Sequence, residues 1–267
     1  MDSAPPPPLD FAFVSLPVLL IGLFVGFAGG LFGKGGSAVA TPLLQLVGVP
    51  AFFAVASPLP AAIPGTLVAS LAYVRAGLYD RRVVLWSVAL GLPATVAGAR
   101  SSAFVGGTGL LLLSNLVIAA LGVSFLARPT WARPAAPPLA PSAVRWRSGA
   151  VGLGVGFLAG LLANAGGFLF APLFARVLRL PLKTAFACSL VASALLAVPG
   201  TAVHVALGHV SWPVVLAFGL GSVPLSYLGA RTAVRMNLRL LEPLFGVALL
   251  LIGAAGAAES LGWIRHL

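Results

Sequence analysis

Two glycine clusters, one in each half of the sequence, hold the residues best suited to bind a ligand. The clusters read FGKGGS, residues 32–37, and ANAGGF, residues 163–168. Each precedes a short apolar run, so free backbone N–H groups and the positive end of a helix dipole would face whatever binds there. Lys34 would add a full positive charge, and Asn164 at the equivalent place would add amide donors. This combination predicts a site for a small anion.

Lys34 also has a simpler interpretation. The glycines could serve only to permit tight turns, with the lysine extending to lipid headgroups. Nucleotide binding is a poorer explanation, because a Walker loop needs glycine at position 28 and serine or threonine at position 35. The sequence has Ala28 and Gly35 at those positions. The choice is therefore between substrate contact and headgroup contact.

A second pair of equivalent segments lies further along each half. Ser57–Pro58 aligns with Cys188–Ser189, near the start of a long apolar run. Prolines interrupt the helical hydrogen bonds and leave backbone groups that need other partners. Interruptions at equivalent places in the two halves therefore favour further substrate-binding residues there. The hydroxyls could equally serve helix packing, and Cys188 could be a small buried apolar residue rather than a reactive thiol. The predicted substrate-binding set is Gly33, Lys34, Gly35, Gly36, Ser37, Ser57, Asn164, Gly166, Gly167, Cys188 and Ser189.

Three further residues are candidates for coupling or gating. Tyr73 aligns with His204, and Arg75 follows two residues after the tyrosine. A histidine can carry a proton near neutral pH, although a packed interfacial histidine is the more common case. The only acids are Asp2, Asp10, Asp80, Glu242 and Glu259. All fall in tails, loops or span ends, so no carboxylate is expected in the bilayer for a cation site, and the sequence predicts neither a cofactor nor a metal.

Composition identifies the class of protein that carries these residues. The chain has 267 residues, of which 60% are hydrophobic and 8% charged, with a mean hydropathy of +1.07. Several apolar runs reach about 20 residues, the length that crosses roughly 30 Å of hydrocarbon. The formal charge is +11, but the basic residues do not alternate with aromatic residues as they do in a nucleic-acid-binding surface. We expect a polytopic membrane protein with no nucleic-acid partner.

The sequence repeats itself. With a shift of 130, residues 22–44 match residues 152–174 at ten of 23 positions. Glycines recur at every fourth residue on one face of each half's first span, a spacing that allows close helix packing. Each half has a long apolar run, a glycine cluster, a short apolar run and three more spans. If the short runs also cross the membrane, each half has five crossings and the two halves have opposite orientations. If they do not cross, each half has four crossings and the halves are parallel.

The basic residues favour ten crossings. Short loops rich in Arg and Lys stay cytoplasmic, and only ten crossings bring the large basic clusters to one side. The inner side would then hold Arg75, Arg81, Arg82, Arg128, Arg133, Arg145, Arg147, Arg176, Arg179, Lys183, Arg231, Arg235 and Arg239. Before the C-terminal tail, the outer loops would hold only Arg100. This distribution predicts an inverted repeat.

The expected fold is all-α, with about eight long transmembrane helices and two short helices that follow the glycine breaks. The predicted segments are a disordered tail (1–11), a first transmembrane repeat (12–126), a Pro-rich basic cytoplasmic linker (127–148), a second, inverted repeat (149–258) and a C-terminal tail (259–267).

Residues 26–83 carry a family resemblance. Their glycine cluster, Pro42, the Gly–Val–Pro turn, Ala56–Ser57 and YVRAGLYD are echoed in the second half, and the pattern resembles the sulfite exporter TauE/SafE family. The resemblance spans about residues 14–258. It implies a multi-pass permease of the bacterial plasma (inner) membrane for small sulfur-containing or organic anions, such as sulfite, thiosulfate or a sulfonate. Lys34 and Asn164 depart from the family's more glycine-rich clusters.

These observations favour a secondary transporter that works by alternating access, with a small anion and the lipid bilayer as its partners. A membrane scaffold or assembly factor is the alternative, although it would not need paired polar breaks. An intramembrane enzyme fits poorly, because the sequence contains no HExxH, no GxGD and no serine in a nucleophile-type turn. The identity of the anion, the direction and coupling of transport and the oligomeric state stay open at this stage.

Overall fold

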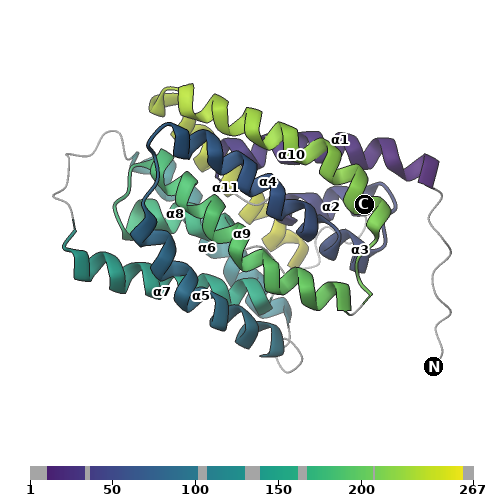
Figure 1. Cartoon of the computed structure of the whole chain (residues 1–267), viewed down its shortest axis with the longest axis horizontal. Coiled ribbons are helices and arrows are strands. Elements are labelled where there is room, and N and C mark those ends of the chain that lie inside the picture. The colour runs from purple at the N-terminus through teal and green to yellow at the C-terminus, as the bar shows by residue number, and fades with distance from the viewer. Residues whose placement is uncertain are drawn as a thin grey trace.

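A computed structural model describes residues 11–33, 37–101, 107–129, 139–161, 167–206 and 208–260. In the part of the chain that it describes, every regular element is a helix (Figure 1). The helices of the first half are α1 (Phe11–Leu31), α2 (Ser37–Leu46), α3 (Ala51–Ala56), α4 (Pro58–Arg75), α5 (Arg81–Ser101) and α6 (Gly107–Ala127). Those of the second half are α7 (Pro141–Leu161), α8 (Gly167–Val177), α9 (Leu182–Ala206), α10 (Trp212–Arg235) and α11 (Leu238–Ser260).

The all-helical prediction is confirmed, and the short helices α2 and α8 follow the two glycine clusters as expected. In the described residues, four helical stretches are long and apolar enough to cross a membrane. They are Phe53–Arg75, Leu182–Ala206, Trp212–Arg235 and Leu238–Ala258. The chain is therefore a multi-pass helical membrane protein by length and composition.

Three boundaries differ from the sequence expectation. The span expected directly after the short apolar run of the first half is interrupted at Ser57, because Pro58 and Pro60 lack the N–H groups that would continue α3 into α4. Helix α7 begins at Pro141, so the last eight residues of the predicted linker are helical; proline suits the first turn of a helix. Helix α11 begins at Leu238, and its Glu242 is fully buried.

Glycines set the main helix pairs. At Gly22, Gly26 and Gly30 of α1, a Cβ atom would meet the backbone of Phe218, Ser222 and Ser226 of α10. At the equivalent Gly152 and Gly156 of α7, it would meet the backbone of Ser87 and Gly91 of α5. The close packing predicted from the glycine spacing is therefore confirmed. Each tight pair, α1–α10 and α5–α7, joins one helix from each half of the sequence.

The two tight pairs flank a central pair. Helix α4 packs against both α10 and α9, and α9 packs against α5. Helices α6 and α11 form a further pair. Exchanging each helix for its counterpart in the other half reproduces the main contacts, and α1 and α7 run in opposite directions across the molecule (Figure 1). An aromatic cluster of Tyr73, Phe125, Phe186 and Phe245 ties α4, α6, α9 and α11 together.

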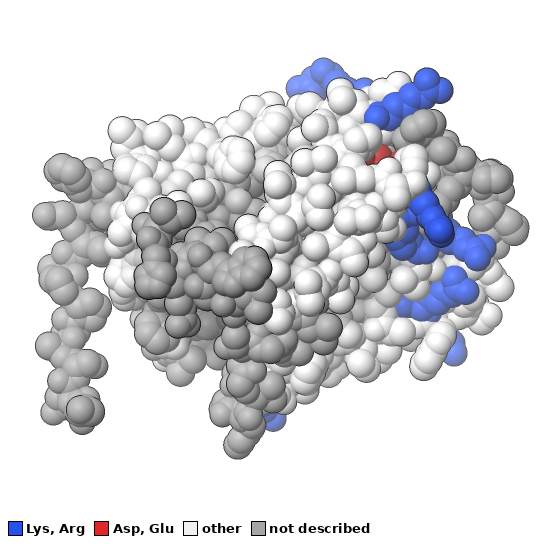
Figure 2. Space-filling model, turned by 180° about the vertical axis from the view of Figure 1, so that it is seen from behind, with Lys and Arg blue, Asp and Glu red and all other residues white. Residues whose placement is uncertain are grey.

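Basic residues gather at one end of the bundle, as Figure 2 shows for one face. Hydrogen bonds join helix ends there: Arg147 donates to the Val177 carbonyl, Arg176 to the Ser124 carbonyl, and Lys183 to the Met236 carbonyl. These contacts bring the C-terminal ends of α6, α8 and α10 beside the N-terminal ends of α7, α9 and α11. We call this the basic end.

Candidate functional site

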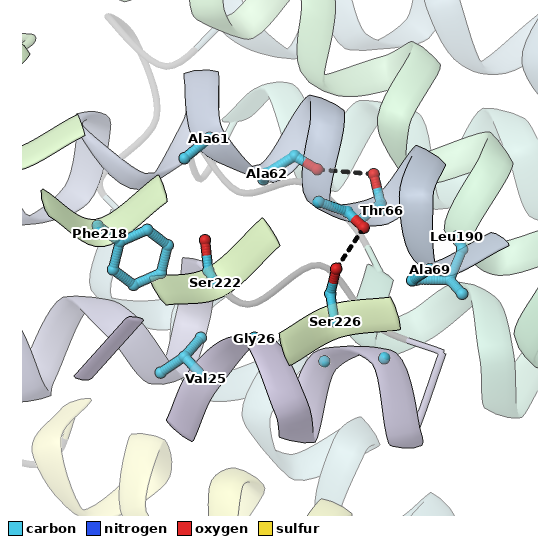
Figure 3. A pocket seen from close by; sticks show the side chains of 13 residues that line it. Val25, Gly26, Ala61, Ala62, Thr66, Ala69, Leu190, Phe218, Ser222 and Ser226 are labelled. Carbon is cyan, nitrogen blue, oxygen red and sulfur yellow. Dashed lines mark hydrogen bonds between the residues drawn. The ribbon is translucent and has the colours of Figure 1, made fainter. Parts of the chain in front are cut away.

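A recess opens between α1, α4 and α10, with α9 at one side (Figure 3). It is partly open, and its cavity volume of about 20 Å³ leaves room for about one water molecule in this conformation. Its walls are small or apolar, apart from three hydroxyl residues. The lining consists of Val25, Gly26, Gly29, Gly30, Ala61, Ala62, Gly65, Thr66, Ala69, Leu190, Phe218, Ser222 and Ser226.

The three hydroxyls differ in what they bind. The Thr66 hydroxyl donates to the Ala62 carbonyl at 2.7 Å, and the Ser226 hydroxyl donates to the Gly65 carbonyl at 2.7 Å. The Ser222 hydroxyl is buried, and among the described residues it has no hydrogen-bond partner. Figure 3 shows it pointing from α10 toward α4. A buried hydroxyl without a partner loses its hydration, so a ligand that accepts a hydrogen bond would recover that loss.

The two halves differ at several equivalent positions of the recess, and two of these differences bear on the open space. Gly65 in α4 corresponds to Leu196 in α9, and Ser222 corresponds to Gly91 in α5. In the second half, the Leu196 methyl groups lie 3.3 Å from where a Gly91 Cβ would stand, so they fill the equivalent space. In the first half, a Cβ on Gly65 would find its closest neighbour at 3.8 Å, the Ser226 hydroxyl. Among the described residues, the space that is open beside Gly65 in the first half is thus filled by Leu196 in the second.

The first glycine cluster begins beside this recess. Gly29 and Gly30 line it, and Gly33 follows with a left-handed φ of 65° that favours glycine. A Cβ on Gly33 would collide with Phe186 of α9, and Leu190, one turn further along α9, lines the recess. The described edge of the cluster therefore lies about one turn, or ~5 Å, from the recess. Ser37 opens α2, whereas Lys34, Gly35 and Gly36 lie outside the described residues.

The described residues on either side of the second glycine cluster do not line the recess. Asn164 and Gly166 lie outside the described residues, and Gly167 opens α8 without joining the lining. On the other flank, the Leu161 backbone lies where a Cβ on Gly98 of α5 would stand. Only the first cluster adjoins the recess in the part of the chain that is described.

The side chains of Ser57 and Cys188 accept hydrogen bonds from backbone N–H groups just before the first residue of another helix. The Ser57 hydroxyl accepts the Ser211 N–H at 3.0 Å, just before α10. The equivalent Cys188 sulfur accepts the Asp80 N–H at 3.4 Å, just before α5. Both residues are fully buried, and they lie at opposite ends of the bundle. Ser57, Cys188 and the buried Ser189 do not line the recess, so the predicted ring of site residues is not assembled in this conformation.

These two contacts give a prediction about stability. We expect Ser57→Ala to destabilise the fold by about 0.5–1.5 kcal/mol, because the partly buried Ser211 N–H would lose its acceptor. Cys188→Ser should keep most of the stability, since the first half already uses serine in this role. Thermal unfolding in detergent measures both. Equal unfolding temperatures for Ser57→Ala and the wild type would contradict the assigned role.

The coupling candidates have distinct surroundings. The Tyr73 hydroxyl donates to the Gly30 carbonyl at 2.9 Å and approaches the Leu31 carbonyl at 3.3 Å. These carbonyls belong to the last turn of α1, where helical partners are missing. Tyr73 therefore fixes the end of α1 beside the recess. Arg75 is exposed at the end of α4. His204 lies in the last turn of α9 beside His209, far along the helix from the basic end.

None of the residues that line the recess was predicted from the sequence as a site residue. A usable signal was present: Ser222 and Ser226 on α10 have the same four-residue spacing as the glycines of α1 that they face. Comparing the halves would also have shown glycine at position 65 opposite leucine at position 196. Neither signal identifies a cavity until the pairing of α1 with α10 is known.

The fold defines a multi-pass helical membrane protein built from two similar halves, with a small recess between α1, α4 and α10. The chain belongs to the sulfite exporter TauE/SafE family, whose model matches residues 18–256. The family expected from the glycine clusters is thereby confirmed.

Bacterial relatives agree with this assignment. A probable membrane transporter protein of Xylella fastidiosa (strain 9a5c) is 28% identical over 236 residues, which cover 86% of this chain and 90% of the relative. The probable membrane transporter protein YunE of Bacillus subtilis (strain 168) is 28% identical over 264 residues, covering 91% of this chain and 96% of the relative. No solved structure matches the chain.

Proposed function

We propose that this protein is a secondary transporter that moves a small sulfur-containing or organic anion across the bacterial plasma membrane. The observation that carries the proposal is the recess between α1, α4 and α10, beside the first glycine cluster. Its buried Ser222 hydroxyl has no hydrogen-bond partner among the described residues. Transporters bind substrate near the interface of their repeats, beside broken helices. The name of the family supports sulfite or a related oxyanion.

The anion would be held by groups from both sides of the recess. On this proposal, Ser222 donates a hydrogen bond, and Lys34 with the N–H groups of Gly35, Gly36 and Ser37 supplies positive charge. The position of Gly33 one turn from Leu190 supports this arrangement. Asn164, Gly166 and Gly167 would serve the substrate at the equivalent place in the second half. Ser57 and Cys188 would support helix starts instead of binding substrate.

The halves would be inverted in the membrane, with the basic end in the cytoplasm. The gathering of Arg and Lys at one end supports this orientation (Figure 2). Alternating access needs rigid units that move against each other. The units best supported by the packing are the pairs α1–α10 and α5–α7, because backbone meets backbone along each. Helices α4 and α9 would form the surface between them.

Lys34→Ala tests the proposed role of the lysine. We expect saturable counterflow of labelled sulfite, thiosulfate or a small sulfonate into liposomes with the wild type. The rate should fall at least tenfold in Lys34→Ala, because a desolvated charge contact contributes about 1.5–3 kcal/mol. Lys34→Arg should keep part of the activity.

Arg82→Ala serves as the matched control, since Arg82 is an exposed cation outside the recess. Unchanged counterflow in Lys34→Ala would reduce the lysine to a headgroup contact. No counterflow of any anion by the folded wild type would contradict the transport proposal and favour a scaffold.

A further inference from the structure

Two histidines meet at the end of the bundle opposite the basic end. His204 lies in the last turn of α9, and His209 follows after Gly208, whose φ of 70° turns the chain back. The His209 N–H donates to the His204 carbonyl at 3.0 Å, which fixes this turn. As a result, the two Nδ1 atoms lie 3.4 Å apart, and both side chains are half-buried.

The distance between the two Nδ1 atoms can be compared with the distances expected for a hydrogen bond and for two ligands of one metal ion. Hydrogen bonds from N–H groups centre near 2.9–3.0 Å, so at 3.4 Å one ring could donate to the other only through a long hydrogen bond. Imidazole nitrogens bind Zn²⁺ at about 2.0–2.1 Å with tetrahedral angles, which places two such ligands about 3.3–3.4 Å apart. The observed separation therefore matches that of two ligands on one metal ion.

We propose that His204 and His209 bind one divalent transition-metal ion of the class that prefers imidazole, such as Zn²⁺, Cu²⁺ or Ni²⁺. Among the described residues, no group of three or more His, Cys, Asp or Glu side chains comes together. Water or another exchangeable ligand would fill the remaining positions. The site would thus be open and weaker than a four-ligand structural zinc site.

Metal binding would tie the end of α9 to the turn that leads into α10. That turn ends at Ser211, whose N–H is already held by Ser57. An ion bridging His204 and His209 would therefore restrain the junction of α9, α10 and α4 at this end of the bundle. The site stands on its own geometry and does not depend on the proposed transport.

Calorimetric titration of Zn²⁺ into the full-length, metal-stripped protein, prepared without a histidine tag, tests the site. We expect one ion per chain. Affinity should fall at least about tenfold in His204→Ala and in His209→Ala, since even outer-shell partners contribute that much to metal binding. The control is His266→Ala, because His266 is the one other histidine of the chain. It should bind Zn²⁺ like the wild type.

His209 lies outside the helices, so its replacement should leave the fold intact, and thermal unfolding of the metal-free variant verifies this. Co²⁺ provides a second measurement, because its visible absorption reports tetrahedral ligation. The bands should appear in the wild type and be absent from the double variant. A wild type that binds no Zn²⁺, a double variant that binds it equally well, or loss of binding in His266→Ala would each overturn the proposal.

Discussion

Replacement of Gly65 by leucine is expected to abolish the proposed anion transport while leaving the helices in place. A Cβ at this position has its closest neighbour at 3.8 Å, an ordinary van der Waals distance, so the side chain can begin there without a backbone collision. It would fill the recess as Leu196 fills the equivalent space in the second half. We expect counterflow to fall by at least two orders of magnitude, because the substrate and the new side chain would occupy the same volume.

Gly200→Leu is the matched control for this change. Gly200 is also a helix glycine, in α9, and a Cβ there would meet nothing within 4 Å. Its variant should transport like the wild type. A Gly65→Leu protein that unfolds at the wild-type temperature but still transports at the wild-type rate would exclude the recess as the binding site.

Gly156→Val is expected to prevent correct folding. Its Cβ would stand where the Gly91 backbone of α5 lies, and backbone cannot rotate away as a side chain can. Overpacking typically lowers the free energy of unfolding by about 1–3 kcal/mol where side chains can adjust. Because backbone cannot adjust in this way, we expect Gly156→Val to lower it by the upper end of that range or more. Gly26→Val should behave alike, because its Cβ would meet the Ser222 backbone of α10.

The same helix offers a control two residues away. Gly154 of α7 is exposed, and a Cβ there would meet nothing within 4 Å. We expect Gly154→Val to give the wild-type yield of monodisperse protein in size-exclusion chromatography, and Gly156→Val to give little or none. Equal yields of the two variants would show that the α5–α7 contact is not as close as described.

Local patterns were sufficient to predict that the chain is helical and which face of α1 packs closely, but not the partner of that face. The glycine spacing at positions 22, 26 and 30 indicated a face for close packing, and the structure places that face against α10. Apolar length located the long helices, and the glycine clusters located the starts of α2 and α8. Helix ends were less accurate at Ser57 and Pro141, where proline decides the boundary and hydropathy does not detect it.

The candidate site depended on information that local patterns lack. The recess combines Gly30, Gly65 and Ser222, which come from three helices far apart in sequence. Cys188 and Ser57 looked like site residues because they are polar and equivalent, yet their partners are helix starts in the other half. The pairing of His204 with His209 was missed because a five-residue spacing is not that of a helix face, and the turn at Gly208 creates the contact.

The packing also changes which parts are expected to move. A repeat in the sequence suggests that the first half rocks against the second. In the structure, however, α1 is locked to α10 and α7 to α5, so each tight unit contains helices from both halves. Motion between these units would alter the recess, because α1 and α10 form one wall and α4 forms another.

The central claim is that the recess at Ser222 binds the substrate anion. The most direct test places a cysteine there, as Ser222→Cys in a Cys188→Ser background that has no other cysteine. The rate at which a membrane-impermeant thiol reagent modifies the introduced cysteine in proteoliposomes is measured with and without a small sulfonate, which does not react with the reagent. We predict modification that slows at least several-fold as the sulfonate saturates transport. A modification rate that does not change at any sulfonate concentration that saturates transport would contradict the account.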